Sequence, residues 1–216
     1  MRYRCLVFDH DDTVVDSTAH VHHPAFLDIL SRIRPGVTMS LEDYFRINFD
    51  PGFIAYCEDV LHFTPDEMAF EYSVWQEWVG THIPTAYPGV REIMERELSE
   101  GGHICVISHS VDVNIRRDWA ANGLPEPELV FGWEQPRERR KPAPWPLLQV
   151  LERLKLQPHE VLMIDDLKPG YDMAKACGVD FAAALWAHEV PEIRTFMRTN
   201  CERCFDTPGA LEKWLF

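Results

Sequence analysis

Residues 3–13 of the 216-residue chain read YRCLVFDHDDT, and this stretch decides the fold. An apolar run rich in strand-forming residues, 3–8, passes directly into an acidic loop, 9–13. A fully buried strand that ends in carboxylates is typical of the parallel sheet of an α/β protein. The same pattern recurs at 103–107, which leads into Ser108-His109-Ser110, and at 161–164, which leads into Asp165-Asp166. Weaker strand patterns occupy 128–131 and 180–185.

Helical patterns separate these predicted strands. Segments 89–100 and 144–155 each carry apolar residues along one helical face, and Gly178 is a suitable helix end. Strands that alternate with helices predict right-handed crossovers and a doubly wound sheet. We therefore predict an α/β fold with a Rossmann-like parallel sheet, in which ligands bind beyond the carboxyl ends of the strands.

The stretch from 17 to 87 interrupts the alternation. Its patterns are helical throughout, and Thr64-Pro65 is a sound helix start, with threonine as N-cap and proline at the first helical position. We predict a catalytic core formed by residues 1–16 and 88–216, with an inserted α-helical cap domain at 17–87.

Composition excludes several classes of protein. The chain has 46% hydrophobic residues and a net charge of −14, which argues against a nucleic-acid partner because such proteins need clustered Lys and Arg. No apolar run approaches the ~20 residues that span a bilayer, and the first residues turn acidic too early for a signal peptide. We expect a cytoplasmic protein without a membrane partner. The six cysteines predict free, largely buried thiols, and Cys201/Cys204 lacks the second pair that a zinc site needs.

The polar clusters at the strand ends carry the candidate chemistry. Asp9 and Asp11, two residues apart, can serve as nucleophile and proton shuttle, although an acidic turn that caps a helix is the alternative. Lys141 lies in a proline-stiffened segment and could neutralise an anionic substrate, or it could belong to a solvated basic patch. Asp165-Asp166 could complete an all-oxygen Mg²⁺ site, or could cap a helix.

Together and in this order, the clusters indicate a protein family far more specifically than any one of them does. VFDHDDT, ICVISHS, KPAP and VLMIDDLKPG resemble the four motifs of the haloacid dehalogenase superfamily, and in particular its beta-phosphoglucomutase-like and phosphoglycolate-phosphatase-like members. Gly170, Ala174 and Gly178 keep the family spacing after Asp166. The helical stretch after the first motif is similar to the family's helical cap.

The resemblance implies a Mg²⁺-dependent phosphatase that hydrolyses a small phosphomonoester through an aspartyl-phosphate. It implies that Asp9 is the nucleophile and Asp11 the general acid and base. The resemblance assigns phosphate binding to four residues, Thr13, Ser108, His109 and Lys141. It assigns metal binding to Asp9, the Asp11 backbone carbonyl and Asp166, with Asp165 as a supporting or alternative ligand. In the cap, His20 and His23 are the expected contacts for substrate selection.

The sequence departs from the family pattern without losing a catalytic group. His10 replaces the usual apolar residue between the two aspartates, Asp12 stands where glycine is commonest, and Leu167 replaces a frequent serine. A phosphomutase built from the same parts is the alternative enzyme, and a non-catalytic binding protein is the alternative of another class. We expect a small phosphate ester as the partner, and a monomer or weak dimer.

Overall fold

The computed structural model describes residues 2–216. The chain forms two compact units: one comprises the residues up to Asp16 together with Thr85–Phe216, and the other is Ser17–Pro84. The second boundary lies three residues before the predicted one, since β2 (Val15–Asp16) pairs antiparallel with β3 (Thr85–Ala86). This pairing keeps both connecting segments within the first unit.

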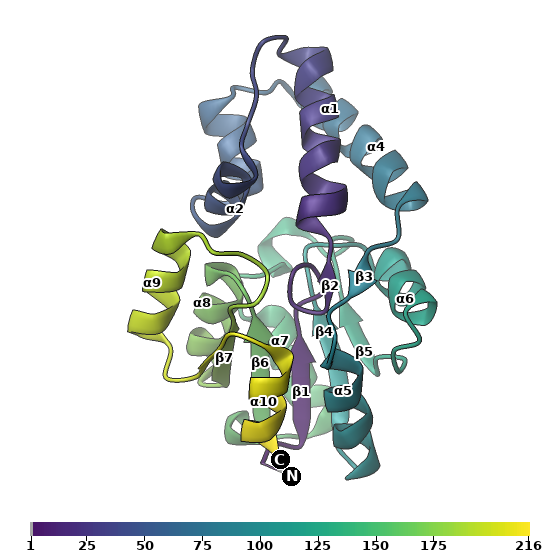
Figure 1. Ribbon diagram of the computed structural model, residues 1–216, viewed down its shortest axis with the longest axis vertical. Helices are drawn as coiled ribbons and strands as arrows, with labels where there is room; N and C mark the ends of the chain where they lie inside the picture. Colours follow the sequence, from purple (N-terminus) through teal and green to yellow (C-terminus); the bar gives the residue numbers. More distant parts are fainter. Residues whose placement is uncertain (1) are drawn as a thin grey trace. The chain divides into compact units, whose positions relative to one another are not determined.

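The first unit is built on a six-stranded sheet whose neighbouring strands are all parallel. Its strands lie in the order β5 (Leu129–Phe131), β4 (His103–Ile107), β1 (Cys5–Phe8), β6 (Val161–Asp165), β7 (Asp180–Ala184) and β8 (Cys204–Phe205) (Figure 1). Phe8 is in register with Val106 on one side and Ile164 on the other, so the polar residues after these strands emerge at one edge of the sheet. The predicted fold class is confirmed; the short strand β8 was not predicted.

Helices cover both faces of this sheet. Leu6 and Phe8 belong to a buried cluster with Val90 and Leu211, whereas Val7, one residue along the strand, points to the opposite face. Figure 1 shows α5 and α10 in front of the sheet and α7 behind it. The helices are α5 (Val90–Ser99), α6 (Asp112–Ala121), α7 (Trp145–Leu154), α8 (Lys168–Cys177), α9 (Pro191–Asn200) and α10 (Pro208–Leu215), with short 3₁₀ turns η3 (Arg137–Arg139) and η4 (Pro158–Glu160).

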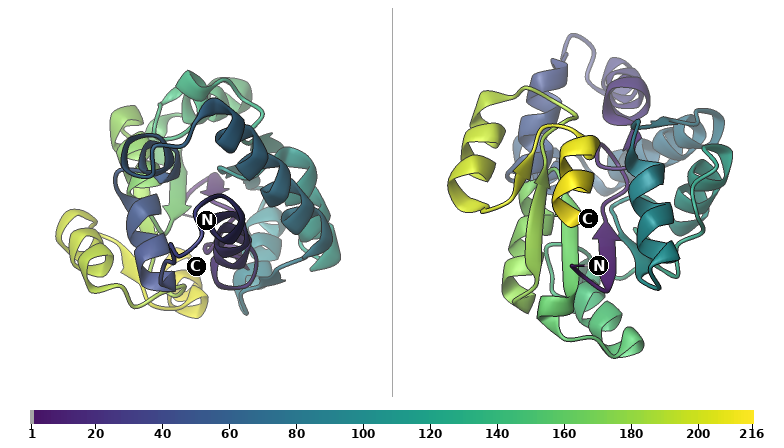
Figure 2. Two further views of the ribbon diagram at one scale, coloured as in Figure 1. Left: turned by 90° about the horizontal axis from the view of Figure 1, so that it is seen from above. Right: turned by 60° about the horizontal axis from the view of Figure 1, so that its bottom comes forward.

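The last helix, α10, packs beside the start of β1. The Arg2 guanidinium lies 4.3 Å from the centroid of the Trp214 ring, and the Tyr3 ring is 5.9 Å from it. The Tyr3 hydroxyl also donates to Asp180 at 2.6 Å. The views in Figure 2 agree that α10 lies next to the start of β1. The two ends of the chain are thereby held together by aromatic and cation–π contacts.

The second unit is helical, as predicted. It contains the π-helical turn η1 (Thr18–His22), α1 (His23–Ile33), α2 (Leu41–Phe49), α3 (Phe53–Ala55), the π-helical turn η2 (Tyr56–Val60) and α4 (Pro65–Thr81). The predicted start of α4 is confirmed: Thr64 accepts from the Glu67 N–H, and the Glu67 carboxylate accepts from the Thr64 N–H, which completes a capping box. Phe26, Leu30 and Tyr44 contribute to a separate small core.

Two further expectations can be compared with the structure. All six cysteines are free thiols, as expected, but only Cys5, Cys57 and Cys105 are buried. The others lie at or near the ends of helices and are half-exposed, which the apolar residues around them did not reveal. Throughout residues 2–216, every helix is too short or too polar to cross a bilayer.

Glu71 on α4 predicts a pH dependence of stability. The residue is 6% exposed, and burial raises the pKa of its carboxyl from 4.5 to about 7. Between these values the unfolded chain has lost the proton and the folded chain keeps it, so stability falls as the pH rises. We expect Glu71→Gln to raise the free energy of unfolding at pH 8 by on the order of 3 kcal/mol, with little change at pH 4.

Urea unfolding followed by circular dichroism at both pH values measures this difference. Glu77→Gln, at an exposed position of the same helix, is the matched control and should shift neither value. An equal gain for Glu71→Gln at pH 4 and pH 8 would contradict the buried, protonated carboxyl.

Candidate active site

The loop after β1 is a tight turn that carries three aspartates, Asp9, Asp11 and Asp12. The Val14 and Val15 N–H groups donate to the His10 carbonyl at 3.0 and 3.1 Å, and the Asp12 N–H donates to the Val15 carbonyl at 2.7 Å. Asp12 has a φ of +58°, a left-handed conformation that glycine, Asn and Asp tolerate best. The turn therefore explains why Asp12 can stand where glycine is commonest. It also leaves Asp9 and Asp11 at the sheet edge.

A buried lysine lies between two of the carboxylates. The Lys141 ammonium is 2.8 Å from Asp9 Oδ1 and 2.8 Å from Asp165 Oδ2. Burial disfavours the charged ammonium, but the two carboxylates outweigh it and raise its pKa. Burial raises the pKa of Asp9 to about 7, against the opposing charge of Lys141. Asp165 Oδ1 accepts from the Leu167 N–H at 2.8 Å, so both oxygens of Asp165 are engaged and its carboxylate holds the lysine in place.

Asp166 supplies a buried carboxylate that is only partly satisfied. Oδ1 accepts from the Thr13 hydroxyl at 3.4 Å, whereas Oδ2 has no hydrogen-bond partner within the described part of the chain. Burial, and then the charges of Asp165, Asp12 and Asp9, raise the pKa of Asp166 well above its ordinary value. A buried carboxylate oxygen without a donor is costly unless a cation or water meets it.

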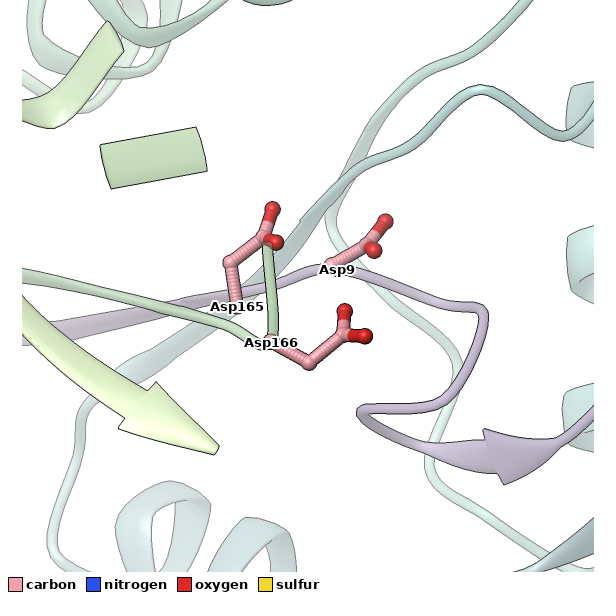
Figure 3. Close-up of side chains that lie close together, drawn as sticks. All are labelled: Asp9, Asp165 and Asp166. Carbon is pink, nitrogen blue, oxygen red and sulfur yellow. The ribbon is translucent and has the colours of Figure 1, made fainter. Parts of the chain in front are cut away.

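The three buried aspartates can share a metal ion. Asp9, Asp165 and Asp166 each offer an oxygen, and these oxygens lie within 4.8 Å of one another. Figure 3 shows that the three side chains converge at the sheet edge, where β1 and β6 end. An all-oxygen donor set with a buried, unpartnered carboxylate oxygen fits a hard divalent cation such as Mg²⁺.

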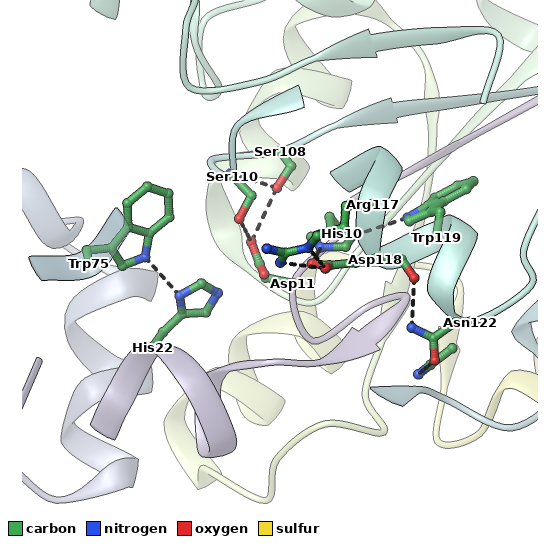
Figure 4. Close-up of polar contacts among 11 residues, drawn as sticks. His10, Asp11, His22, Trp75, Ser108, Ser110, Arg117, Asp118, Trp119 and Asn122 are labelled. Carbon is green, nitrogen blue, oxygen red and sulfur yellow. Dashed lines mark hydrogen bonds and ion pairs between the residues drawn. The ribbon is translucent and has the colours of Figure 1, made fainter. Parts of the chain in front are cut away.

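Asp11 is held by two serines from the loop after β4. The Ser110 hydroxyl donates to Asp11 Oδ2 at 2.7 Å, and the Ser108 hydroxyl approaches the same oxygen at 3.4 Å (Figure 4). The sequence did not single out Ser110; its only signal is its place in the Ser-His-Ser cluster. The Ser108 N–H donates to the Phe131 carbonyl and the Ser110 N–H to Ser108 Oγ. Both of these N–H groups are therefore engaged within the chain.

His109 supports the segment that carries the lysine. Its Nε2 is 2.8 Å from the Lys141 carbonyl oxygen, and because a carbonyl only accepts, Nε2 carries the proton and donates it. The ring also meets the Trp133 ring edge to face, with centroids 5.9 Å apart. The imidazole thus fixes the Lys141 backbone, and its predicted contact with phosphate stays a prediction.

The structure gathers most of the predicted site residues in the first unit. The contacts described above involve seven of them: Asp9, Asp11, Thr13, Ser108, Lys141, Asp165 and Asp166. His20 and His23 belong to the helical unit, where His23 Nε2 lies 2.9 Å from the Met39 carbonyl and the imidazole packs against Tyr44. The role of both histidines in substrate selection stays a prediction.

The chain is similar to known proteins in both sequence and fold. The sequence model of the haloacid dehalogenase-like hydrolases matches residues 6–184. The chain is 32% identical to a phosphoglycolate phosphatase of Nitrosospira multiformis over 94 residues, which make up 43% of this chain and 41% of that protein. It is 25% identical to a phosphoglycolate phosphatase of Aquifex aeolicus over 194 residues, 86% of each chain. Its fold is similar to that of a Bacteroides fragilis protein described as a haloacid dehalogenase-like hydrolase, with a TM-score of 0.82 at 21% identity over 97% and 99% of the chains.

Gly170 offers a test of how Lys141 and Asp165 are positioned. A Cβ atom at this position in α8 would lie 2.1 Å from Asp165 Oδ2, so any side chain displaces the carboxylate. We expect Gly170→Ala to lower activity at least ~10-fold and to destabilise the protein by about 1–3 kcal/mol. Phosphate release and thermal unfolding measure these effects.

The control is Gly209→Ala in α10, where a Cβ atom meets nothing within 4 Å. We expect full activity in that variant and a stability equal to or slightly above that of the wild type. A Gly170→Ala variant as active as Gly209→Ala would show that the contact between α8 and Asp165 does not matter.

Proposed function

Since the chain belongs to the haloacid dehalogenase-like hydrolases and is a phosphoric monoester hydrolase, we propose that it cleaves a small phosphomonoester through an aspartyl-phosphate on Asp9. In this proposal Asp11 is the general acid and base, and Mg²⁺ is the cofactor. The observation that supports it best is the buried Lys141 ammonium, 2.8 Å from both Asp9 and Asp165, beside the partly satisfied Asp166. This arrangement combines a nucleophile with positive charge for a phosphate dianion.

The first half of the reaction transfers the phosphoryl group to the protein. An Asp9 carboxylate oxygen attacks phosphorus, an Asp9–phosphorus bond forms, and the bond from phosphorus to the ester oxygen breaks. Asp11 gives its proton to the departing oxygen. Both serine hydroxyls donate to Asp11 Oδ2, and these contacts hold the carboxyl group in place for this transfer. Lys141 offsets the negative charge that the phosphate brings close to Asp9.

The second half returns Asp9 to its starting state. A water molecule attacks the phosphorus of the aspartyl-phosphate, and Asp11, now ionised, takes a proton from it. The Asp9–phosphorus bond breaks, and inorganic phosphate leaves. The two serine contacts to Asp11 serve both steps, because they orient its carboxyl group in either protonation state.

The residues present fit Mg²⁺. Asp9 and Asp166 would hold it, with the Asp11 backbone carbonyl, whereas Asp165 stays on Lys141 because both of its oxygens are engaged. When bound, Mg²⁺ supplies positive charge that polarises the phosphoryl oxygens. The unpartnered Asp166 Oδ2 is a buried oxygen at this site that such a cation would satisfy.

Phosphoglycolate is the first substrate to test, because the two curated relatives are phosphoglycolate phosphatases. We propose that the helical unit, residues 17–84, acts as a cap that selects the substrate, with His20 and His23 among the contacts. A cytoplasmic location and a monomeric or weakly dimeric state complete the proposal.

Phosphate release from phosphoglycolate, sugar phosphates and nucleotides, measured with and without a bisphosphate, tests the function. A phosphomutase would need the bisphosphate and would release little phosphate.

Removal of the metal should abolish turnover. We expect no phosphate release in excess EDTA and full recovery with added Mg²⁺, since several carboxylates face one ammonium at the site. Asp166→Asn should raise the Mg²⁺ concentration for half-maximal activity at least ~10-fold, which a Mg²⁺ titration measures. Asp172→Asn, at a half-exposed residue paired with Lys168 at 2.7 Å, is the control. Undiminished turnover in EDTA would overturn the metal assignment.

Substitution of each catalytic aspartate should have a distinct effect. Asp9→Asn should abolish turnover and leave no phosphorylated protein in a rapid acid quench, because an amide is not a competent nucleophile. Asp11→Asn should lower kcat/KM for an alkyl phosphate ~10²–10⁴-fold, and far less for p-nitrophenyl phosphate, whose leaving oxygen needs no proton. Wild-type rates in the Asp9 variant would contradict the covalent route. Circular dichroism confirms that both variants fold.

A further inference from the structure

The side chain between the two catalytic aspartates points into the protein. His10 is 1% exposed, and its imidazole meets two residues of α6. Its Nε2 lies 3.3 Å from Asp118 Oδ2, and the Trp119 indole N–H donates to its Nδ1 at 3.2 Å (Figure 4). The proposed chemistry uses none of these three residues.

The contacts fix the tautomer of His10. An indole N–H can only donate, so Nδ1 must accept and carries no proton. The ring proton therefore lies on Nε2 and is donated to Asp118. Both nitrogens are then satisfied in a buried setting, and the plane of the ring is fixed by partners on opposite sides.

Asp118 is itself held rigidly. Its second oxygen, Oδ1, accepts from Arg117 Nε at 2.8 Å and from Arg117 Nη2 at 2.6 Å. The Asn122 side chain donates to the Asp118 carbonyl at 2.8 Å and accepts from the Ala86 N–H on β3 at 2.9 Å. The partner of His10 is thus anchored at its carboxylate and through its backbone.

The same helix leads directly from the residue that holds Asp11. Ser110, which donates to Asp11 at 2.7 Å, is followed at Asp112 by the start of α6. Asp11 is therefore held at its carboxylate by Ser110 and through the neighbouring backbone by His10. Trp119 is 1% exposed within the core cluster, so α6 is a firm support for both contacts.

We propose that His10 is a positioning residue for Asp11, acting through the network of His10, Asp118 and Trp119. An apolar side chain could fill the same space without the cost of desolvating polar groups. What the hydrogen bonds of His10 add is a fixed orientation of the side chain, which apolar contacts alone would not set. It fixes the turn in the one orientation in which the Asp11 carboxyl reaches the leaving oxygen. This inference rests on the proposed acid and base role of Asp11.

The dependence on the leaving group tests the inference. We expect His10→Phe to lower kcat/KM for phosphoglycolate about 10- to 100-fold, mostly through kcat, and for p-nitrophenyl phosphate less than about 3-fold. His10→Gln, whose amide can donate and accept, should recover part of the loss. His103→Phe removes another histidine–carboxylate pair, 2.6 Å from Glu128, and as the control should leave both substrates unaffected.

The outcomes separate the two proposals. If Asp11→Asn discriminates between the substrates and His10→Phe lowers both equally or neither, the positioning role is overturned and the acid role of Asp11 stands. If Asp11→Asn fails to discriminate, both fall. Selective loss in His10→Phe with partial recovery in His10→Gln supports the positioning role.

A spectroscopic measurement does not depend on activity. In ¹⁵N-detected NMR of the full chain, we expect His10 to show a protonated Nε2 and an unprotonated Nδ1. Trp119→Phe, which removes the indole donor and keeps an aromatic ring, should leave Nδ1 without its hydrogen bond, shift the Nδ1 resonance and reproduce the selective loss on phosphoglycolate. A protonated Nδ1 in the wild type, or a Trp119→Phe variant that keeps full activity on both substrates, would overturn the network.

Discussion

The ion pairs of Lys141 with Asp9 and Asp165 are the interaction on which the rest of the site depends. Several carboxyl groups are buried at one sheet edge, and each would be expensive to ionise there without a cation. A lysine 2.8 Å from two of them places a cation beside Asp9, the proposed nucleophile. Removing the lysine would leave two buried carboxylates without a cation, which is far costlier than losing a surface ion pair.

The fold delivers these groups through the register of its central strands. β1 lies between β4 and β6, so the loops that carry Asp9, Ser108 and Asp165 are neighbours by construction. α8 approaches so closely that only glycine fits at position 170. The His109 imidazole fixes the Lys141 carbonyl from the other side. Backbone geometry, rather than side-chain flexibility, therefore sets the distances in the site.

Sequence patterns predicted the parts of the protein that depend on local order. Buried strands, their acidic ends and the capping box at Thr64 follow from short-range periodicity and from single-residue preferences. Ser110 and the surroundings of His10 could not be predicted in this way. His10 meets Asp118 across 108 positions of sequence, and that contact exists only because α6 packs against the first strand's loop. The same reasoning applies to β8, which is too short to show a pattern.

The charge balance of the site links its proposed cofactor to its proposed acid. Asp9, Asp11, Asp165 and Asp166 face the single ammonium of Lys141, and a bound phosphate dianion would add further negative charge. Such an excess favours a divalent cation near the unpartnered Asp166 oxygen and a proton on one of the carboxyl groups. Asp11 alone among the four carries hydroxyl contacts from two serines and adjoins the fixed imidazole of His10. Hydroxyl donors favour the ionised form of a carboxyl group, so the two serine contacts position Asp11, whereas the excess of negative charge is what favours a proton within the cluster.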